Sequence, residues 1–89
     1  MRIDEKDLNN VIDRINKATG NALTPYTKQG EKYVTNIGNY HLDCAYGGYS
    51  LHQMVSEGGG VTDVFRCGHV PKRDLYNRMQ AFLTGLGLK

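Results

Sequence analysis

The stretch GNYHLDCAYGGYSLHQMV, residues 38–55, decides the fold of this chain. Apolar and polar side chains alternate through residues 40–45 and again through residues 49–55, which is the period of strands with one buried face. The Gly47-Gly48 pair between them supplies the positive φ that a tight hairpin turn needs. The stretch therefore predicts an antiparallel hairpin.

The same pattern extends in both directions from this hairpin. Residues 31–37 precede it and are separated from it by the turn pair Gly38-Asn39, and residues 61–66 follow it after the glycine run 58–60. Short alternating segments separated by glycine-containing turns are typical of a meander. We expect these four segments to form one four-stranded antiparallel sheet.

A helix is expected on each side of the meander. Apolar residues recur at helical spacing after Asp4, a capping residue, and the pattern stops at Gly20. A second amphipathic pattern begins at Pro71, whose fixed φ suits the first helical position, and continues to Thr84 or Leu86. Both helices carry an apolar stripe that must be buried.

Residues 21–30 contain Pro25 and Gly30 and show no apolar period, so we expect them to be an ordered connector. The predicted fold is α+β in the order α-β-β-β-β-α, with residues 1–89 as a single domain. Two amphipathic helices can bury their stripes on one sheet face. The other sheet face is therefore expected to be open.

The composition is that of a small globular domain. The chain has 89 residues, of which 39% are hydrophobic and 22% charged. No apolar run reaches the ~18 residues that span a bilayer, and the start Met1–Asp7 lacks the apolar core of a signal peptide. We expect a cytoplasmic protein with no membrane partner, in which Cys44 and Cys67 stay reduced. The net charge of +2 is too small to indicate a nucleic-acid partner.

The open sheet face offers a first set of candidate functional residues. Two imidazoles and a carboxylate can bind a metal ion or act as acid and base, and the same surface can also dock a protein partner. The spacing of these residues in the sequence, taken alone, favours an ordinary solvated surface over a metal or catalytic site. No nucleophile elbow, Cys-x-x-Cys pair or Walker loop is present, so neither an enzyme nor a cofactor is predicted. The candidate residues are His41, Asp43, His52 and Met54.

A second metal hypothesis combines His41, Cys44, Cys67 and His69, because zinc accepts two imidazoles and two thiolates in a tetrahedral site. On a regular strand His41 and Cys44 point to opposite faces, so the pair binds one ion only if a bulge intervenes. Buried free thiols are the simpler interpretation, and no metal site is predicted.

The basic segment 66–78 carries the strongest functional signal. It contains four basic residues and one acidic residue, Asp74, which gives a local net charge of +3. The rest of the chain has a net charge of −1. Lys72 and Arg73 fall in the first turn of the last helix, where exposed N–H groups favour anions. These cations therefore predict an anion site, unless they extend into solvent or pair with carboxylates of the chain. The predicted ligand-binding residues are Arg66, Gly68, His69, Lys72 and Arg73, with Tyr46 and Tyr49 as rings on which a base can stack.

Several runs of sequence resemble a group of small accessory proteins encoded by tailed bacteriophages. The likeness covers nearly the whole chain, but it carries no assigned activity or functional residues. It implies a setting, since short phage genes of this kind often encode inhibitors of bacterial immunity in the host cytoplasm. The runs that carry it are residues 38–43, 45–48, 58–61, 63–65 and 72–77.

Two functions are therefore expected, and they belong to different classes. The first is a non-enzymatic counter-defence protein that sequesters an anionic, nucleotide-like ligand at the basic segment. The alternative is an inhibitor that docks on a host defence enzyme through the open sheet face. A domain with an uncovered sheet edge also gains from self-association, so a homodimer or larger closed oligomer is expected.

Overall fold

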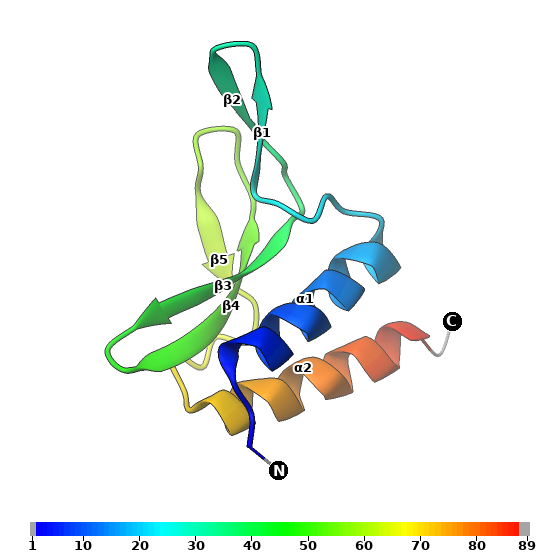
Figure 1. Cartoon of the computed structure of the whole chain (residues 1–89), viewed down its shortest axis with the longest axis vertical. Coiled ribbons are helices and arrows are strands. Elements are labelled where there is room, and N and C mark those ends of the chain that lie inside the picture. The colour runs from blue at the N-terminus through cyan, green and yellow to red at the C-terminus, as the bar shows by residue number, and fades with distance from the viewer. Residues whose placement is uncertain (1, 88–89) are drawn as a thin grey trace.

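The computed structural model describes residues 2–87 and shows an α+β fold with two helices and two antiparallel sheets (Figure 1). Helix α1, Glu5–Thr19, starts and stops where the sequence predicts. Asp4 and Asp7 form a reciprocal capping box, and Gly20 ends the helix at φ 75°. The boundaries of α1 are thus set by local interactions alone.

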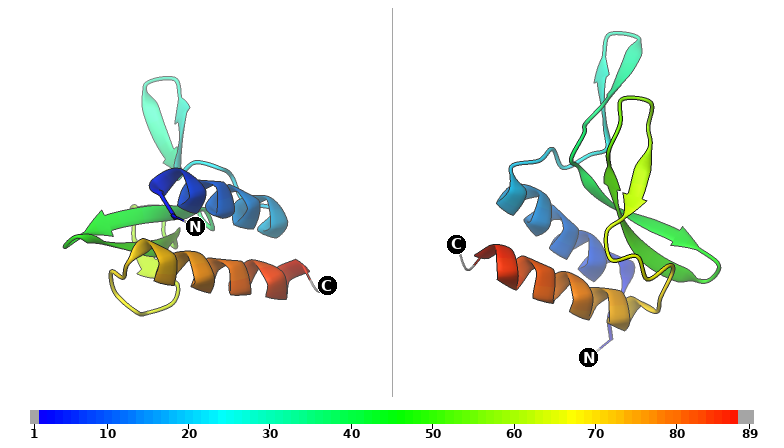
Figure 2. Two further views of the ribbon diagram at one scale, coloured as in Figure 1. Left: turned by 60° about the horizontal axis from the view of Figure 1, so that its bottom comes forward. Right: turned by 180° about the vertical axis from the view of Figure 1, so that it is seen from behind.

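Helix α2, Lys72–Gly87, packs alongside α1 and runs beside it in every view (Figure 2). It begins one residue after Pro71, whose carbonyl accepts the N–H of Leu75 at 3.1 Å and closes the first turn. Leu75 and Met79 are completely buried, which confirms the apolar stripe expected on this helix.

The central sheet has the order β3-β4-β5, with β3 at Tyr40–Ala45, β4 at Gly48–Met54 and β5 at Val61–Asp63. The turn between β3 and β4 is made by Tyr46 and Gly47, both at positive φ, one residue earlier than the predicted glycine pair. Positive φ at both turn positions matches the right-handed twist of the flanking strands.

Both helices cover one face of this sheet, as predicted. The core joins the apolar stripes of the helices to Tyr40 and Leu51, with Leu42 and Tyr49 packed at its edge. Asn16 of α1 is fully buried within this layer and binds both backbone groups of Tyr40, accepting from its N–H and donating to its carbonyl. These two hydrogen bonds fix the position of α1 relative to β3.

The prediction of a single four-stranded sheet is wrong. Strand β2, Lys32–Thr35, pairs with β1, Tyr26–Gln29, which lies in the segment predicted to be a connector. The two form a separate hairpin that projects from the body of the molecule (Figure 1). A bend at Asn36 and Gly38, where the Asn36 carbonyl accepts the N–H of Asn39, turns the chain before it can join β3.

The segment 64–71 also departs from the prediction, because β5 ends at Asp63 rather than at residue 66. The chain leaves the edge of β4 after the N–H of Val64 donates to Leu51, and returns where Val70 bridges Tyr49. Val64, Phe65 and Val70 of the intervening segment pack against the helix-side core, whereas His69 reaches Asp43 on the sheet face that the helices leave free. This face was expected to be open, but Met54 on it is only 2% exposed.

Candidate functional site

Two cations of the basic segment, Lys72 and Arg78, have partners within the chain. The Lys72 Nζ lies 5.5 Å from the centre of the Tyr49 ring, a cation–π contact. The Tyr49 hydroxyl in turn donates to Glu5 at 3.2 Å, so its ring belongs to the edge of the core rather than to an open stacking platform. Arg73 lies in the same helical turn, and Arg78 pairs with Asp74 at 2.8 Å.

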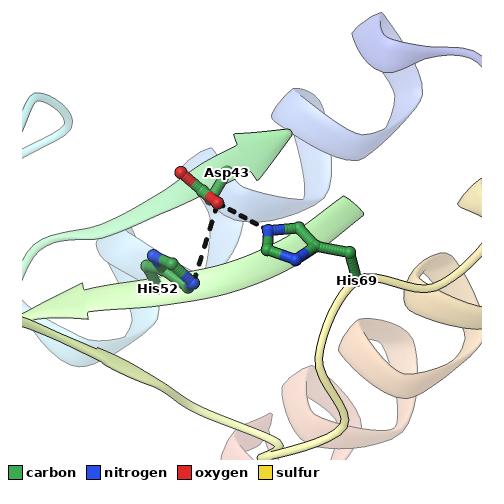
Figure 3. A group of neighbouring side chains, drawn as sticks. All are labelled: Asp43, His52 and His69. Atoms are coloured by element: carbon green, nitrogen blue, oxygen red, sulfur yellow. Dashed lines mark hydrogen bonds and ion pairs between the residues drawn. The ribbon is translucent and has the colours of Figure 1, made fainter. Parts of the chain in front are cut away.

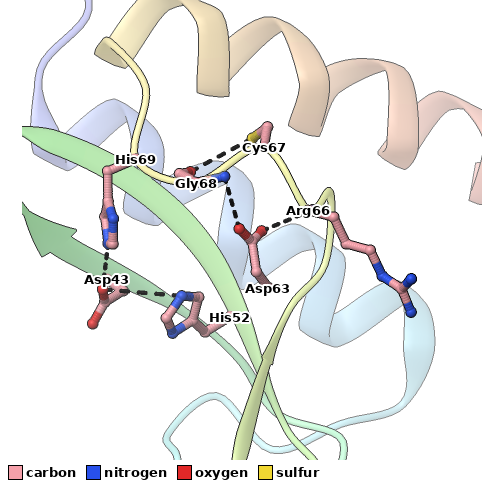
Figure 4. Close-up of polar contacts among 7 residues, drawn as sticks. All are labelled: Asp43, His52, Asp63, Arg66, Cys67, Gly68 and His69. Carbon is pink, nitrogen blue, oxygen red and sulfur yellow. Dashed lines mark hydrogen bonds and ion pairs between the residues drawn. The ribbon is translucent and has the colours of Figure 1, made fainter.

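The backbone donors expected to hold an anion near Gly68 already have an anionic partner. Asp63 accepts the N–H of Gly68 at 3.0 Å and the N–H of Arg66 at 3.1 Å (Figure 4). Arg66 and Gly68 both have positive φ, which turns their N–H groups toward this carboxylate. The Arg66 side chain points away from His69 and Asp43. The loop is therefore organised around an internal carboxylate.

The most polar convergence lies on the sheet face opposite the helices. The three histidines of the chain all reach this face: His41 and His52 are opposite each other on β3 and β4, and His69 enters from the loop before α2. The imidazoles of His52 and His69 gather near Asp43 (Figure 3). His69 Nε2 donates to Asp43 Oδ2 at 2.6 Å, and His52 Nε2 lies 3.9 Å from the same oxygen.

Backbone packing explains how His69 reaches a residue so distant in sequence. The Val70–Tyr49 bridge brings the loop against β4, and Gly48 lets it approach closely, because a Cβ there would lie 2.8 Å from the His69 carbonyl carbon. The Asp63 hydrogen bonds brace the other side of the loop. The imidazole of His69 is thus held over the sheet by backbone contacts on both sides.

The electrostatics of this cluster favour the ionised form of the Asp43 carboxyl group and the neutral form of the His41 ring. The hydrogen bond from His69 lowers the pKa of Asp43, and partial burial offsets this only in part. Burial, followed by the nearby His52, lowers the pKa of His41. The Asp43 side chain is 40% exposed, whereas those of His52 and His69 are 17% and 19% exposed. The carboxylate therefore has one side toward solvent.

Ser50 lies directly opposite Asp43 on β4 and shares its sheet face. Its hydroxyl is fully buried and has no hydrogen-bond partner among the described residues. A buried hydroxyl without a partner costs free energy, so Ser50 is a donor that the polar cluster leaves unused in this arrangement.

The zinc quartet of His41, Cys44, Cys67 and His69, which the sequence analysis considered and did not predict, does not assemble. Cys44 lies on the helix-covered side of β3 and approaches Glu5 at 4.0 Å, whereas His41 lies on the opposite side. Burial, followed by the Glu5 charge, raises the pKa of the Cys44 thiol. Strand parity, used in the sequence analysis against this quartet, is the physical reason.

A second candidate surface lies at the far end of the molecule. We use the name hairpin surface for the exposed apolar side chains on the β1–β2 hairpin, on its flanks and on the ends of β4 and β5. Tyr33, Val34 and Ile37 line a shallow groove of about 430 Å³ within it, together with Thr35 and Glu57. The hairpin surface comprises Leu23, Tyr26, Tyr33, Val34, Ile37, Val55 and Val61, which are 42% to 68% exposed.

Among the residues that the structure describes, neither helix is long and apolar enough to cross a bilayer. Comparison with family models, with curated proteins and with solved structures finds no match to this chain. The case for a function therefore depends on the geometry of these two surfaces.

Sequence reasoning found His41, Asp43 and His52 on one face but missed the part played by His69. The separation of 26 residues between Asp43 and His69 is closed only by the loop after β5. The hairpin surface was missed because residues 26–29 are exposed on both sides and show no apolar period. Two short segments with strand-forming residues, one on each side of Gly30, were the feature from which the hairpin could have been predicted.

Proposed function

We propose that the protein is a non-enzymatic binding protein that attaches to another protein through the hairpin surface and acts by occupying that partner. The observation that carries this proposal is the distribution of exposed apolar side chains. Eight large hydrophobic side chains are exposed among residues 2–87, and seven of them belong to the hairpin surface; the eighth is Tyr46. A concentration of exposed apolar side chains in one part of a molecule is a feature of protein interaction sites.

The backbone of the hairpin supports the same proposal. Strands β1 and β2 pair with each other, and neither pairs with a strand of the central sheet. Their outer edges therefore present N–H and C=O groups to which an extended segment of a partner can add as a further strand. An isolated two-stranded hairpin is only marginally stable in water, so a partner strand also stabilises it.

The charges of the hairpin favour a different protein over a second copy. Lys28 lies on β1 and Lys32 on β2, so each edge strand carries an exposed cation. Lysines on edge strands oppose self-pairing. We therefore propose a partner segment that combines apolar side chains with carboxylates placed to pair with Lys28 and Lys32. If the chain shares the setting of the phage proteins it resembles, that partner is a host defence protein.

The test compares the wild type with a double variant, Tyr33→Ser with Val34→Ser, and with Tyr46→Ser as a matched control. Tyr46 is 98% exposed and lies outside the hairpin surface. Tagged protein is expressed in a bacterial host, and the affinity of each captured protein is then measured with purified components. We expect a partner whose affinity falls at least about tenfold in the double variant and stays unchanged in Tyr46→Ser.

Two results contradict this proposal. One is a partner that binds all three proteins equally, since its contact then lies elsewhere. The other is a concentration-dependent dimer in analytical ultracentrifugation that the double variant abolishes, since this assigns the hairpin surface to a second copy.

Capture of a nucleotide-like anion by the basic segment remains a prediction with weaker support, because Asp63 occupies the donors of Arg66 and Gly68. A nucleotide mixture that raises the melting temperature of the wild type, but not that of Lys72→Ala with Arg73→Ala, favours it over the protein partner.

A further inference from the structure

A group of metal-ligating side chains, none of which belongs to the hairpin surface, lies on the sheet face opposite the helices. Asp43, His52 and His69 each offer one ligand atom, and these atoms all lie within 4.8 Å of one another. They come from β3, from β4 and from the loop that precedes α2 (Figure 3). Three separate segments of backbone therefore direct imidazole or carboxylate groups to one point.

The distances between the ligand atoms are close to those of a coordinated ion. Metal–nitrogen and metal–oxygen bonds of about 2.1 Å at tetrahedral or octahedral angles place two ligand atoms about 3.0 to 3.4 Å apart. The Asp43–His69 separation of 2.6 Å is slightly shorter, and the Asp43–His52 separation of 3.9 Å is slightly longer. Shifts of less than about 1 Å, within the reach of side-chain torsions, bring both to these values.

The backbone holds these groups in place before any ion binds. Asp43 and His52 are diagonal neighbours across the β3–β4 pair, a spacing that long side chains can bridge. His69 is held by the Val70 bridge to β4 and by close packing over Gly48. A site on paired strands and a braced loop loses little conformational entropy when it binds an ion.

The chemistry of the donors selects the type of ion. Two imidazole nitrogens with one carboxylate suit zinc and its first-row neighbours, whereas calcium and magnesium prefer oxygen ligands alone. The exposed side of Asp43 leaves coordination positions that water can fill, as in sites with three protein ligands. The buried Ser50 hydroxyl, opposite Asp43 and without a partner among the described residues, can donate a hydrogen bond to the ligating carboxylate.

We propose that Asp43, His52 and His69 bind one divalent transition-metal ion of the zinc type, with an open, solvent-facing coordination position. His41 is not a ligand: its Nδ1 lies 3.3 Å from Asn39 Oδ1, and its ring packs edge-on to that of His52. The ion links the loop before α2 to the sheet, so binding stabilises the folded chain. This proposal is independent of the hairpin surface.

The test uses the full chain, stripped of metal by a chelator that is then removed. Zn²⁺ is titrated by calorimetry, and the visible absorption of the Co²⁺ form reports the ligand type. We expect one ion per chain and Co²⁺ bands without thiolate charge transfer. His52→Ala and His69→Ala each weaken binding at least about tenfold, whereas the matched controls His41→Ala and Cys44→Ser leave it unchanged. Saturating Zn²⁺ raises the melting temperature of the wild type by about 10 °C.

The stability of the metal-free variants is measured alongside, so that loss of binding is not confused with loss of fold. Where His69→Ala fails to fold, Asp43→Asn and His52→Gln replace it. Three results overturn the proposal: no heat and no change in melting temperature with Zn²⁺ and Co²⁺, binding that survives in both histidine variants, or thiolate charge transfer in the Co²⁺ spectrum of the wild type.

Discussion

The central sheet and the β1–β2 hairpin are both antiparallel, yet they differ in what their side chains contact. Helices bury one face of the central sheet, and Ser50, Leu51 and Met54 of β4 are almost completely buried. All four residues of β1 and three of the four in β2 are exposed. Strand pairing is thus not sufficient for a core, because the stabilisation comes from the layers that pack against a sheet.

The same comparison separates the two proposed functions. The central sheet fixes polar groups with little freedom, which suits the binding of a small ion. The hairpin presents apolar groups and free backbone edges, which suit a macromolecular partner. The two sites can therefore be altered independently, and the following predictions test how far the body and the hairpin behave as separate units.

The largest effect is expected from a cavity in the body. Leu51 is fully buried between the sheet and the helices, so Leu51→Ala should lower the free energy of unfolding by about 3 kcal/mol. In the hairpin, Val34→Ala should lower it by no more than about 0.5 kcal/mol, because Val34 is 42% exposed. Urea denaturation measures both. Equal losses would show that the hairpin is part of the cooperative core.

A slightly smaller effect is expected from the polar contact between α1 and β3. Asn16→Ala removes both hydrogen bonds to Tyr40 and leaves its buried N–H and carbonyl unpaired, which should cost about 2 to 3 kcal/mol. The exposed Asn10 on the same helix is the control, since Asn10→Ala should be neutral or slightly stabilising. Chemical denaturation that finds the two variants equally stable would argue against this anchor.

The smallest effect concerns the pH dependence of stability. The folded pKa of Asp43 lies below its usual value of 3.8, mainly because of the hydrogen bond from His69. The contribution of the ionised Asp43 to the stability of the fold is therefore fully present above pH 3.8 and is lost as the pH falls through the folded pKa. We expect the melting temperature of Asp43→Asn to fall less steeply than that of the wild type below about pH 4. Glu31→Gln, at an exposed position of the hairpin turn, should follow the wild-type curve.

Local signals in the sequence determined the parts of the fold that depend on neighbouring residues. Asp4 and Asp7 satisfy the first N–H groups of α1 from within one turn, and Gly20 ends the helix because it adopts φ 75° without strain. Alternation through residues 40–54 set which side chains share a sheet face, and Cys44 and His41 lie on opposite sides as that parity requires. Such features need no knowledge of the rest of the chain.

Only the tertiary structure decided where His69 lies, which strand pairs with β2 and which carboxylate accepts the N–H of Gly68. The contact of His69 with Asp43 closes a separation of 26 residues, whereas the pairing of β2 with β1 and the contact of Gly68 with Asp63 are choices between near neighbours and the adjoining strand or an external anion. Their free energies compete with alternatives of similar local propensity, so short-range patterns do not distinguish them. The sequence therefore determined the elements and their buried faces, while long-range packing decided which polar groups converge.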